Sequence, residues 1–156
     1  GSLNMRVVHG LTELEQLTGT TVGTSGWVRV TQEMVNTFSD VTGDHQWIHL
    51  DVERATRELP VGGPIVQGFL TLSLVIKFRT EILDVRGVTR TINYGLNRVR
   101  FIAPVVVGTR LRGTETILST ERTAPHSLRL TSSCVVSAEG LSKPVCSAEI
   151  VTLLYE

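Results

Sequence analysis

Residues 65–83 form a segment that is apolar on nearly every face of a helix, and it constrains the fold more than any other stretch. Breaker residues at 62–64 precede it, and the proline among them is typical of a first helical turn. A helix that is apolar all round has to be buried on most of its sides. Because Lys77 and Arg79 interrupt the segment, we predict a wrapped core helix and no membrane span.

Strand-like segments lie on both sides of this helix in the sequence. They cover residues 21–30, 88–101, 109–122, 127–137 and 145–154. The fourth of them alternates with a period of two, which is typical of a strand with one buried face. Long strands in succession favour an antiparallel sheet. Together the elements predict an α+β hotdog fold, a curled antiparallel sheet of about five strands wrapped around a long central helix.

Two shorter helices are expected between the first strand and the core helix. Thr31 can cap the first of them, because apolar residues at 34, 35, 38 and 41 follow on one helical face. This helix is expected to end near Gly43. Asp51 can cap a short polar helix over residues 52–58. The connection between the two helices is predicted to be irregular.

Length and charge narrow the class of protein. The 156 residues predict one domain over residues 5–156, and we interpret residues 1–4 as a cloning remnant before Met5. Lys and Arg together number 15, as do Asp and Glu, so we expect no nucleic-acid partner held by bulk charge. Because we see neither a secretory leader nor a long apolar run, we expect a cytoplasmic protein without a membrane partner.

The two cysteines and one histidine near the C-terminal end have unremarkable sequence contexts. Cys134 and Cys146 are too far apart for a CxxC motif, so we predict two buried free thiols. His126 follows a proline in a predicted turn and is expected at the surface.

The densest polar cluster covers residues 42–51. In an irregular segment, Asp44 and His49 can point at one spot, where a carboxylate takes a proton from a water molecule and an imidazole orients it. A chance occurrence of the two residue types is the alternative. A metal site could combine His45 and His49 with Asp44 and Asp51. Since no further ligand is fixed elsewhere in the sequence, we predict no metal.

Gln67 and Gly68 stand at the predicted start of the core helix. The first N–H groups of a helix lack intrahelical partners, and the helix dipole favours negative charge there. A glycine also lets a carbonyl oxygen approach the backbone closely. Close packing of the helix on the sheet would explain the glycine equally well. Beside Asp44 and His49, however, Gly68 predicts an oxyanion hole that faces a water-activating pair.

These motifs resemble a known family. The runs FSDVTGD…HLD (residues 38–51) and GPIVQGFL (residues 63–70) resemble the MaoC-like (R)-specific enoyl-CoA hydratases, whose pattern is close to SGDxNPxHxD followed by a His-Gly pair. The runs DHQWIH and INYGLNRVRF look like the single-hotdog, NodN-like branch found in mycobacteria. The resemblance extends from about Gly26 to the C-terminus. Gln46-Trp47 and Gln67 depart from the family pattern, which affects the walls of the site.

The resemblance implies reversible addition of water to a trans-2-enoyl thioester, giving an (R)-3-hydroxyacyl thioester. It implies Asp44 and His49 as catalytic residues, with Gly68, Gln46 and Gln67 in contact with the substrate. It also implies that no metal or redox cofactor is needed, because the CoA or carrier-protein thioester is the substrate. Family members are homodimers with the acyl tunnel near the interface.

Two other functions remain open for such a chain. A hotdog thioesterase would hydrolyse the thioester at its carbonyl carbon, and a non-catalytic acyl- or lipid-binding module would keep the tunnel alone. Strand residues Asn97, Arg98 and Arg100 are further candidates for contact with CoA, although arginines on strands are commonly solvated.

Overall fold

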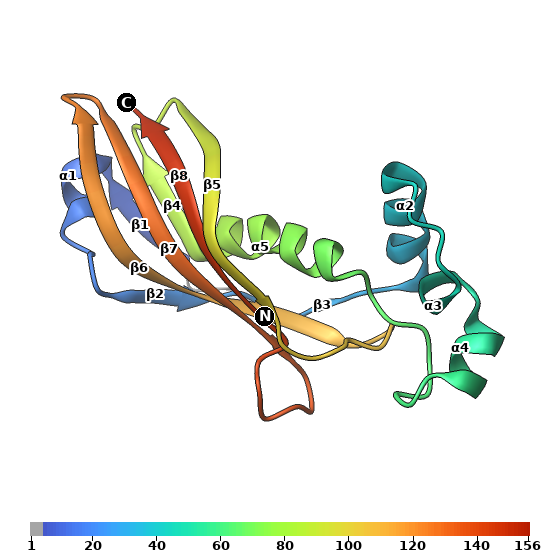
Figure 1. Cartoon of the computed structure of the whole chain (residues 1–156). Coiled ribbons are helices and arrows are strands. Elements are labelled where there is room, and N and C mark those ends of the chain that lie inside the picture. The colour runs from blue at the N-terminus through green and yellow to red at the C-terminus, as the bar shows by residue number, and fades with distance from the viewer. Residues whose placement is uncertain (1–4) are drawn as a thin grey trace.

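The computed structural model describes residues 5–156, and residues 1–4, interpreted above as a cloning remnant, lie outside the described residues. In chain order the elements are β1 (Arg6–His9), α1 (Gly10–Glu15), β2 (Thr21–Thr24), β3 (Val28–Arg29), α2 (Gln32–Thr42), α3 (Trp47–Leu50), α4 (Val52–Glu58), α5 (Gly68–Ile82), β4 (Leu83–Arg86), β5 (Arg90–Phe101), β6 (Arg110–Ala124), β7 (Ser127–Ala138) and β8 (Cys146–Tyr155). Figure 1 shows the long strands curled around α5, with α2, α3 and α4 forming a helical lobe at the N-terminal end of α5.

The main sheet is antiparallel and has the order β2-β6-β7-β8-β5, with β3 also paired to β6. The predicted α+β hotdog fold is confirmed. The expected strand over residues 21–30 is divided into β2 and β3, so the sheet has six strands where about five were predicted. The register shifts between Thr21 and Gly23, and Gly26 lies in the stretch that separates the two strands. Glycine weakens strand pairing, which explains the division.

The core helix begins later than predicted. α5 starts at Gly68 because residues 65 and 66 are extended against the chain that precedes β6. The Val66 N–H donates to the Val105 carbonyl oxygen over 2.8 Å. The proline at 64 therefore lies before the helix and not in its first turn, so that prediction was wrong.

α5 is buried or half-buried on most of its sides, as predicted, but one face of it is open in the single chain. Leu70, Val75 and Phe78 are buried against the sheet. Phe69 and Ile76 on the same helix are 67% and 54% exposed. An apolar helix with one open face indicates that something other than this chain's own sheet covers that face.

The caps of the shorter helices agree with the sequence. The Thr31 side chain accepts a hydrogen bond from the Met34 N–H at the start of α2, and Gly43 ends the helix with a φ of 78°. Asp51 caps α4 by accepting from the Arg54 N–H. The connection between α2 and α4 is less irregular than predicted, because it contains the single turn α3.

The N-terminal segment was not predicted to be structured. β1 pairs in parallel with β4, and both lie with α1 at the C-terminal end of α5. Val8, Leu11 and Leu14 are buried there with Ile82 and Leu128, in a cluster separate from the one around Phe78. These elements are too short for a clear period, so tertiary packing decides their structure.

Several smaller predictions can be settled. Cys134 and Cys146 are buried free thiols, as predicted. His126 is exposed in the turn between β6 and β7, also as predicted. Within residues 5–156, no helix is long and apolar enough to cross a membrane.

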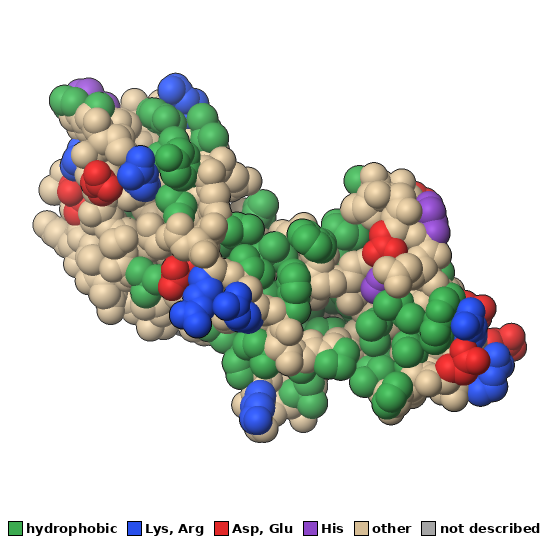
Figure 2. Space-filling model, viewed as in Figure 1, with side chains coloured by type: hydrophobic (Ala, Val, Ile, Leu, Met, Phe, Trp, Pro, Cys, Tyr) green, Lys and Arg blue, Asp and Glu red, His purple; other side chains and the backbone are tan. Residues whose placement is uncertain are grey.

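One side of the protein is open and apolar. β5 is an edge strand, and Ile92, Tyr94 and Leu96 on it are 45%, 60% and 49% exposed. Figure 2 shows hydrophobic side chains gathered in the hollow between the curled sheet and the helical lobe. A contiguous exposed apolar face of this kind marks an interaction surface.

Candidate functional site

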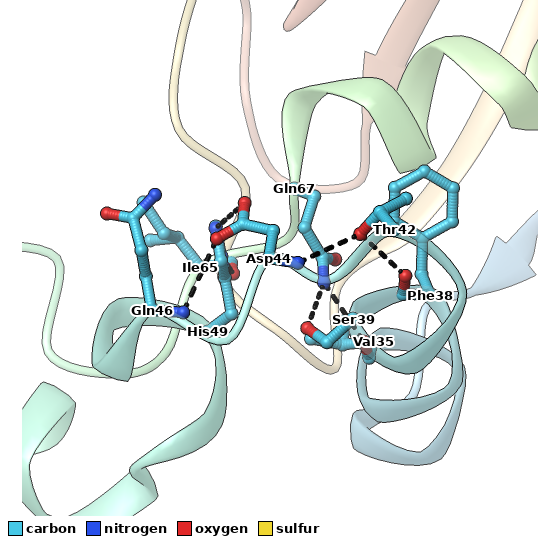
Figure 3. A network of polar contacts seen from close by, with 9 residues as sticks. All are labelled: Val35, Phe38, Ser39, Thr42, Asp44, Gln46, His49, Ile65 and Gln67. Carbon is cyan, nitrogen blue, oxygen red and sulfur yellow. Dashed lines mark hydrogen bonds and ion pairs between the residues drawn. The ribbon is translucent and has the colours of Figure 1, made fainter.

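Asp44 and His49 meet at the N-terminal end of α5. Asp44 Oδ2 lies 3.5 Å from His49 Nε2. The His49 side chain is 7% exposed, whereas that of Asp44 is 38% exposed, so the pair opens outward through its carboxylate. Figure 3 shows the two side chains pointing toward each other, with Ile65 and Gln67 beside them. The structure thus brings the two predicted catalytic residues together.

The contact of the other ring nitrogen of His49 determines which of the two nitrogens carries the hydrogen. His49 Nδ1 lies 2.7 Å from the Ile65 carbonyl oxygen. A carbonyl oxygen only accepts hydrogen bonds, so Nδ1 carries the hydrogen. In the neutral ring, Nε2 then has its lone pair directed toward Asp44. This contact also fixes the orientation of the ring, which a catalytic histidine requires.

Local backbone structure positions the carboxylate. Gly43 ends α2 in the left-handed region, which turns the chain so that the Asp44 N–H donates to Thr42 Oγ1 over 3.3 Å. The Gln46 N–H donates to Asp44 Oδ1, also over 3.3 Å. Oδ2 is therefore left to face His49. His49 itself lies in α3, where its side chain is directed inward.

Gln67 connects α5 to α2. Its Nε2 donates to the Val35 carbonyl oxygen over 2.9 Å and to Ser39 Oγ over 2.8 Å. Both amide hydrogens are thus used inside the protein, and only Oε1 has no partner among the described residues. Gln67 is 4% exposed, so its main visible role is to hold the start of α5 against the helical lobe. Its predicted contact with substrate stays a prediction.

The sequence reasoning missed Ser39 and the carbonyl group of Ile65. Ser39 is fully buried and follows Val35 by one helical turn. A small polar residue on the apolar face of an amphipathic helix was the signal available for it. No pattern reveals that the Ile65 carbonyl would receive His49, because that contact depends on where the chain before α5 passes.

Gly68 is the first residue of α5, and Gln67 is its N-cap. Among residues 5–156, no hydrogen bond uses the Gly68 N–H. A Cβ at this position would lie 3.1 Å from the Phe101 ring, closer than ordinary van der Waals contact. Gly68 and Phe101 also line a cavity of about 290 Å³. The N–H group is thus free for a ligand oxygen, as the oxyanion prediction requires.

The side chains of the remaining candidates make no contact with Asp44 or His49 among the described residues. Gln46 is exposed and contributes its backbone N–H to Asp44, so substrate contact by its side chain stays a prediction. His45 is exposed, and Asp51 is used in the cap of α4. Asn97 and Arg98 are exposed on β5. The same strand ends at Phe101, which lines a cavity together with Gly68.

The arrangement is suited to handling one water molecule. Both Asp44 Oδ2 and the lone pair of His49 Nε2 accept hydrogen bonds, and a water molecule has two hydrogens to donate. The free N–H at the start of α5 offers a donor, supported by the dipole of the helix, to an oxygen that gains negative charge. The chemical pieces are a proton acceptor, an orienting group and an anion-stabilising donor.

Comparison with known proteins agrees with these features. The profile of the MaoC like domain matches residues 13–131. The chain is 46% identical over 147 residues to 3-hydroxyacyl-thioester dehydratase Z of Mycobacterium tuberculosis, covering 94% of this chain and 97% of that protein. It is 41% identical over 146 residues to nodulation protein N of Rhizobium meliloti, covering 92% and 89%.

Among solved structures, the R-hydratase PhaJ1 from Pseudomonas aeruginosa is similar with a TM-score of 0.71 and 24% identity, covering 93% of this chain and 84% of that one. This likeness shows the shared fold. The resemblance to the NodN-like branch is confirmed by the relatives named above. On the profile match and on the identity to relatives over nearly its whole length, the chain belongs to the MaoC-like family.

Proposed function

We propose that this protein is a hydro-lyase that reversibly adds water to a trans-2-enoyl thioester to give an (R)-3-hydroxyacyl thioester. The observation that carries the proposal is the pair of acceptors, Asp44 Oδ2 and His49 Nε2, 3.5 Å apart with the imidazole fixed by Ile65. The 46% identity to a mycobacterial 3-hydroxyacyl-thioester dehydratase supports the same reaction class.

In the hydration direction, a water molecule donates one hydrogen to Asp44 and the other to His49 Nε2. Its oxygen bonds to C3 of the enoyl thioester as the C2–C3 double bond breaks, and the water proton passes to one of the two side chains. Negative charge develops on the thioester oxygen and is met by the Gly68 N–H. A donor of this kind is worth roughly 3–4 kcal/mol. The proton then returns to C2, so water is added without any other change.

The proposed reaction needs no cofactor. Addition of water transfers no electrons, and the chain's own carboxylate, imidazole and N–H group supply the proton transfer and charge stabilisation. The thioester itself, whether of CoA or of a carrier protein, is the substrate. Asp44, His49 and Gly68 are the residues we place in contact with it.

The proposed active form is a homodimer. The exposed face of α5 and the edge strand β5 form one apolar side of the chain, and Phe69, Ile76 and Tyr94 are all more than half exposed on it. A second copy related by a two-fold axis would cover the same surface on both protomers. Sedimentation of the protein should give twice the chain mass, and Ile76→Glu should shift it toward the monomer. A monomeric wild-type protein would contradict this part of the proposal.

Crotonyl-CoA provides the direct test. The protein is mixed with crotonyl-CoA, and loss of the enoyl absorbance is followed together with release of free thiol. We expect absorbance loss without thiol release. Thiol release would instead indicate a thioesterase. Binding without either change, including with longer enoyl chains, would indicate a non-catalytic acyl-binding module.

A further inference from the structure

The side-chain amide of Gln67 ties α2 to the start of α5 in one fixed orientation. Its Nε2 donates to the Val35 carbonyl oxygen over 2.9 Å and to Ser39 Oγ over 2.8 Å. A carbonyl oxygen only accepts hydrogen bonds, so Nε2 and not Oε1 has to face Val35. Figure 3 shows the amide directed from the start of α5 to α2.

At one end of this link, Gln67 determines the direction of the Gly68 N–H. That N–H belongs to the same planar peptide unit as the Gln67 carbonyl group, and the two point in opposite directions. The Gln67 carbonyl oxygen accepts from the N–H groups of Leu70 and Thr71 in the first turn of α5, over 3.0 Å and 3.2 Å. A shift of Gln67 therefore turns the N–H group that we place against the thioester oxygen.

At the other end, Ser39 leads to Asp44. Ser39 is fully buried on α2, and its carbonyl oxygen accepts from the Gly43 N–H over 2.8 Å. Gly43 ends the helix, and Asp44 is the next residue. Hydrogen bonds and peptide bonds therefore connect the Gly68 N–H, through Gln67 and Ser39, to the carboxylate that accepts from water.

The imidazole of the pair is held separately, by the chain just before α5. His49 Nδ1 lies 2.7 Å from the Ile65 carbonyl oxygen, and the Ile65 N–H donates to the Ile48 carbonyl oxygen over 2.9 Å. The segment 65–68 therefore holds the imidazole through Ile65 and the carboxylate through Gln67. It carries the N–H donor as well, so one short segment positions all three groups.

Packing alone does not account for a glutamine at this position. Its surroundings include Val35, Val66 and Leu70, which are buried members of the apolar core. Gln67 Oε1 is buried without a partner among the described residues, and an unpaired buried acceptor lowers stability. Apolar contacts are non-directional, whereas hydrogen bonds restrict distance and angle. The amide therefore contributes geometry that an apolar side chain would not supply.

We propose, on the basis of the proposed function, that Gln67 is a positioning residue: its amide fixes the distance and direction of the Gly68 N–H relative to Asp44. This role needs no contact between Gln67 and the substrate, since both amide hydrogens are engaged. The Gly68 N–H acts where negative charge develops in the transition state. A displaced donor therefore lowers kcat more than it raises KM.

Gln67→Met tests this role, because methionine keeps the unbranched shape of the side chain and removes both hydrogen bonds. We expect kcat for crotonyl-CoA to fall about 10- to 100-fold, as for a displacement of up to about 1 Å, with KM changed by less than about threefold. Gln16→Met is the matched control, since Gln16 is exposed at the end of α1, and it should leave both constants unchanged. An unchanged kcat in a folded Gln67→Met protein, or an effect on KM alone, would overturn the proposal.

Ser39→Ala gives a second test that leaves Gln67 in place. It removes one of the two acceptors, so kcat should fall by about three- to tenfold, the value of one hydrogen bond. The double variant Ser39→Ala/Gln67→Met should match Gln67→Met alone within about twofold, because both changes break the same link. Fully additive losses would mean that the two residues act independently, which contradicts the link.

A spectroscopic test does not depend on turnover. In amide nitrogen–proton correlation spectra, Ser39→Ala should shift the signal of Gly68 and Gln67→Met should shift that of Asp44, because each change acts across the link. Gln16→Met should shift neither. Unshifted signals would overturn the proposal even if turnover fell. A wild-type protein that hydrated no enoyl thioester, while its variants showed both shifts, would overturn the proposed function and leave the link supported.

Discussion

A carboxylate lies next to a nitrogen-containing side chain near each end of α5. The two pairs differ in their exposure to solvent and in the residue that faces the carboxylate. Asp44 is 38% exposed and lies 3.5 Å from a histidine. Glu115 is 1% exposed and lies 3.2 Å from an arginine. Histidine gains and loses protons near neutral pH, whereas arginine stays charged. The first pair can therefore exchange protons with a substrate, and the second can only hold charge in place.

Backbone support differs between the ends as well. Asp44 lies in a connection after α2, where its own N–H donates to Thr42 Oγ1 and its carboxylate accepts from the Gln46 N–H. Glu115 lies in the middle of the long strand β6, paired on both sides, to β2 and to β7. Functional groups that meet substrate are commonly found on connections carried by a rigid scaffold. The comparison places an accessible carboxylate at the N-terminal end of α5 and an enclosed one at its C-terminal end.

The largest expected effect is on turnover at the first pair. Asp44→Asn and His49→Gln should each lower hydration of crotonyl-CoA by at least about 100-fold, because each removes a proton acceptor. Measurement of kcat/KM checks this, with the melting temperature as a control for folding. Full activity in either variant would remove that residue from the catalytic pair.

The second pair should affect stability instead. Glu115→Ala leaves the Arg79 guanidinium without its partner and should lower the free energy of unfolding by roughly 2–4 kcal/mol, reduced by the partial exposure of Arg79. Arg79→Met/Glu115→Leu should recover most of that loss. Urea unfolding of the three proteins measures both effects. If the single and double variants were equally unstable, the cost would come from packing and not from charge.

A smaller effect is expected where α5 begins. Gly68→Ala keeps the N–H group but places a Cβ 3.1 Å from the Phe101 ring. Because that ring is 50% exposed, it can shift, and we expect a loss of kcat/KM of up to about tenfold with little change in stability. Phe101→Leu in the Gly68→Ala background should restore activity, with Phe101→Leu alone as the control. Failure of the restoration would show that the glycine matters for another reason.

The smallest effect is at Cys134, opposite Glu115 on β7. Burial, reinforced by the charge of Glu115, raises the pKa of the Cys134 thiol to about 12. In the unfolded chain this thiol loses its proton near its ordinary pKa, so ionisation stabilises the unfolded state above that pH and the free energy of unfolding falls as pH rises. The free energy of unfolding should fall between pH 8 and pH 9.5, and Cys134→Ala should make that fall smaller by less than about 1 kcal/mol. Urea unfolding at both pH values measures it, and an unchanged pH dependence would contradict the assignment.

Much of the fold could be predicted because its elements carry long patterns. The period of two in β7, the caps at Thr31 and Asp51 and the turn at Gly43 all depend on neighbouring residues. β1, α1 and β4 could not be predicted, because each is too short to show a period and is held by contacts with distant parts of the chain.

The site could be predicted in part for the same reason. Asp44, His49 and Gly68 belong to a motif that is readable in the sequence, whereas Ser39 and the Ile65 carbonyl join them only through the packing of α2 and α5. Burial of Glu115 beside Arg79 was likewise hidden, since the two residues are far apart in the chain and both are ordinarily exposed types.

By itself, the sequence determined the fold class, the family and which residues are candidates for activating water, because these depend on local periodicity and on a short motif. Only the tertiary structure decided which nitrogen of His49 faces Asp44, how α5 is held to α2 by Gln67, and that one face of α5 stays open. It also decided that Glu115 is buried beside Arg79. These are contacts between segments distant in the chain, and no one-dimensional pattern fixes the distances between them.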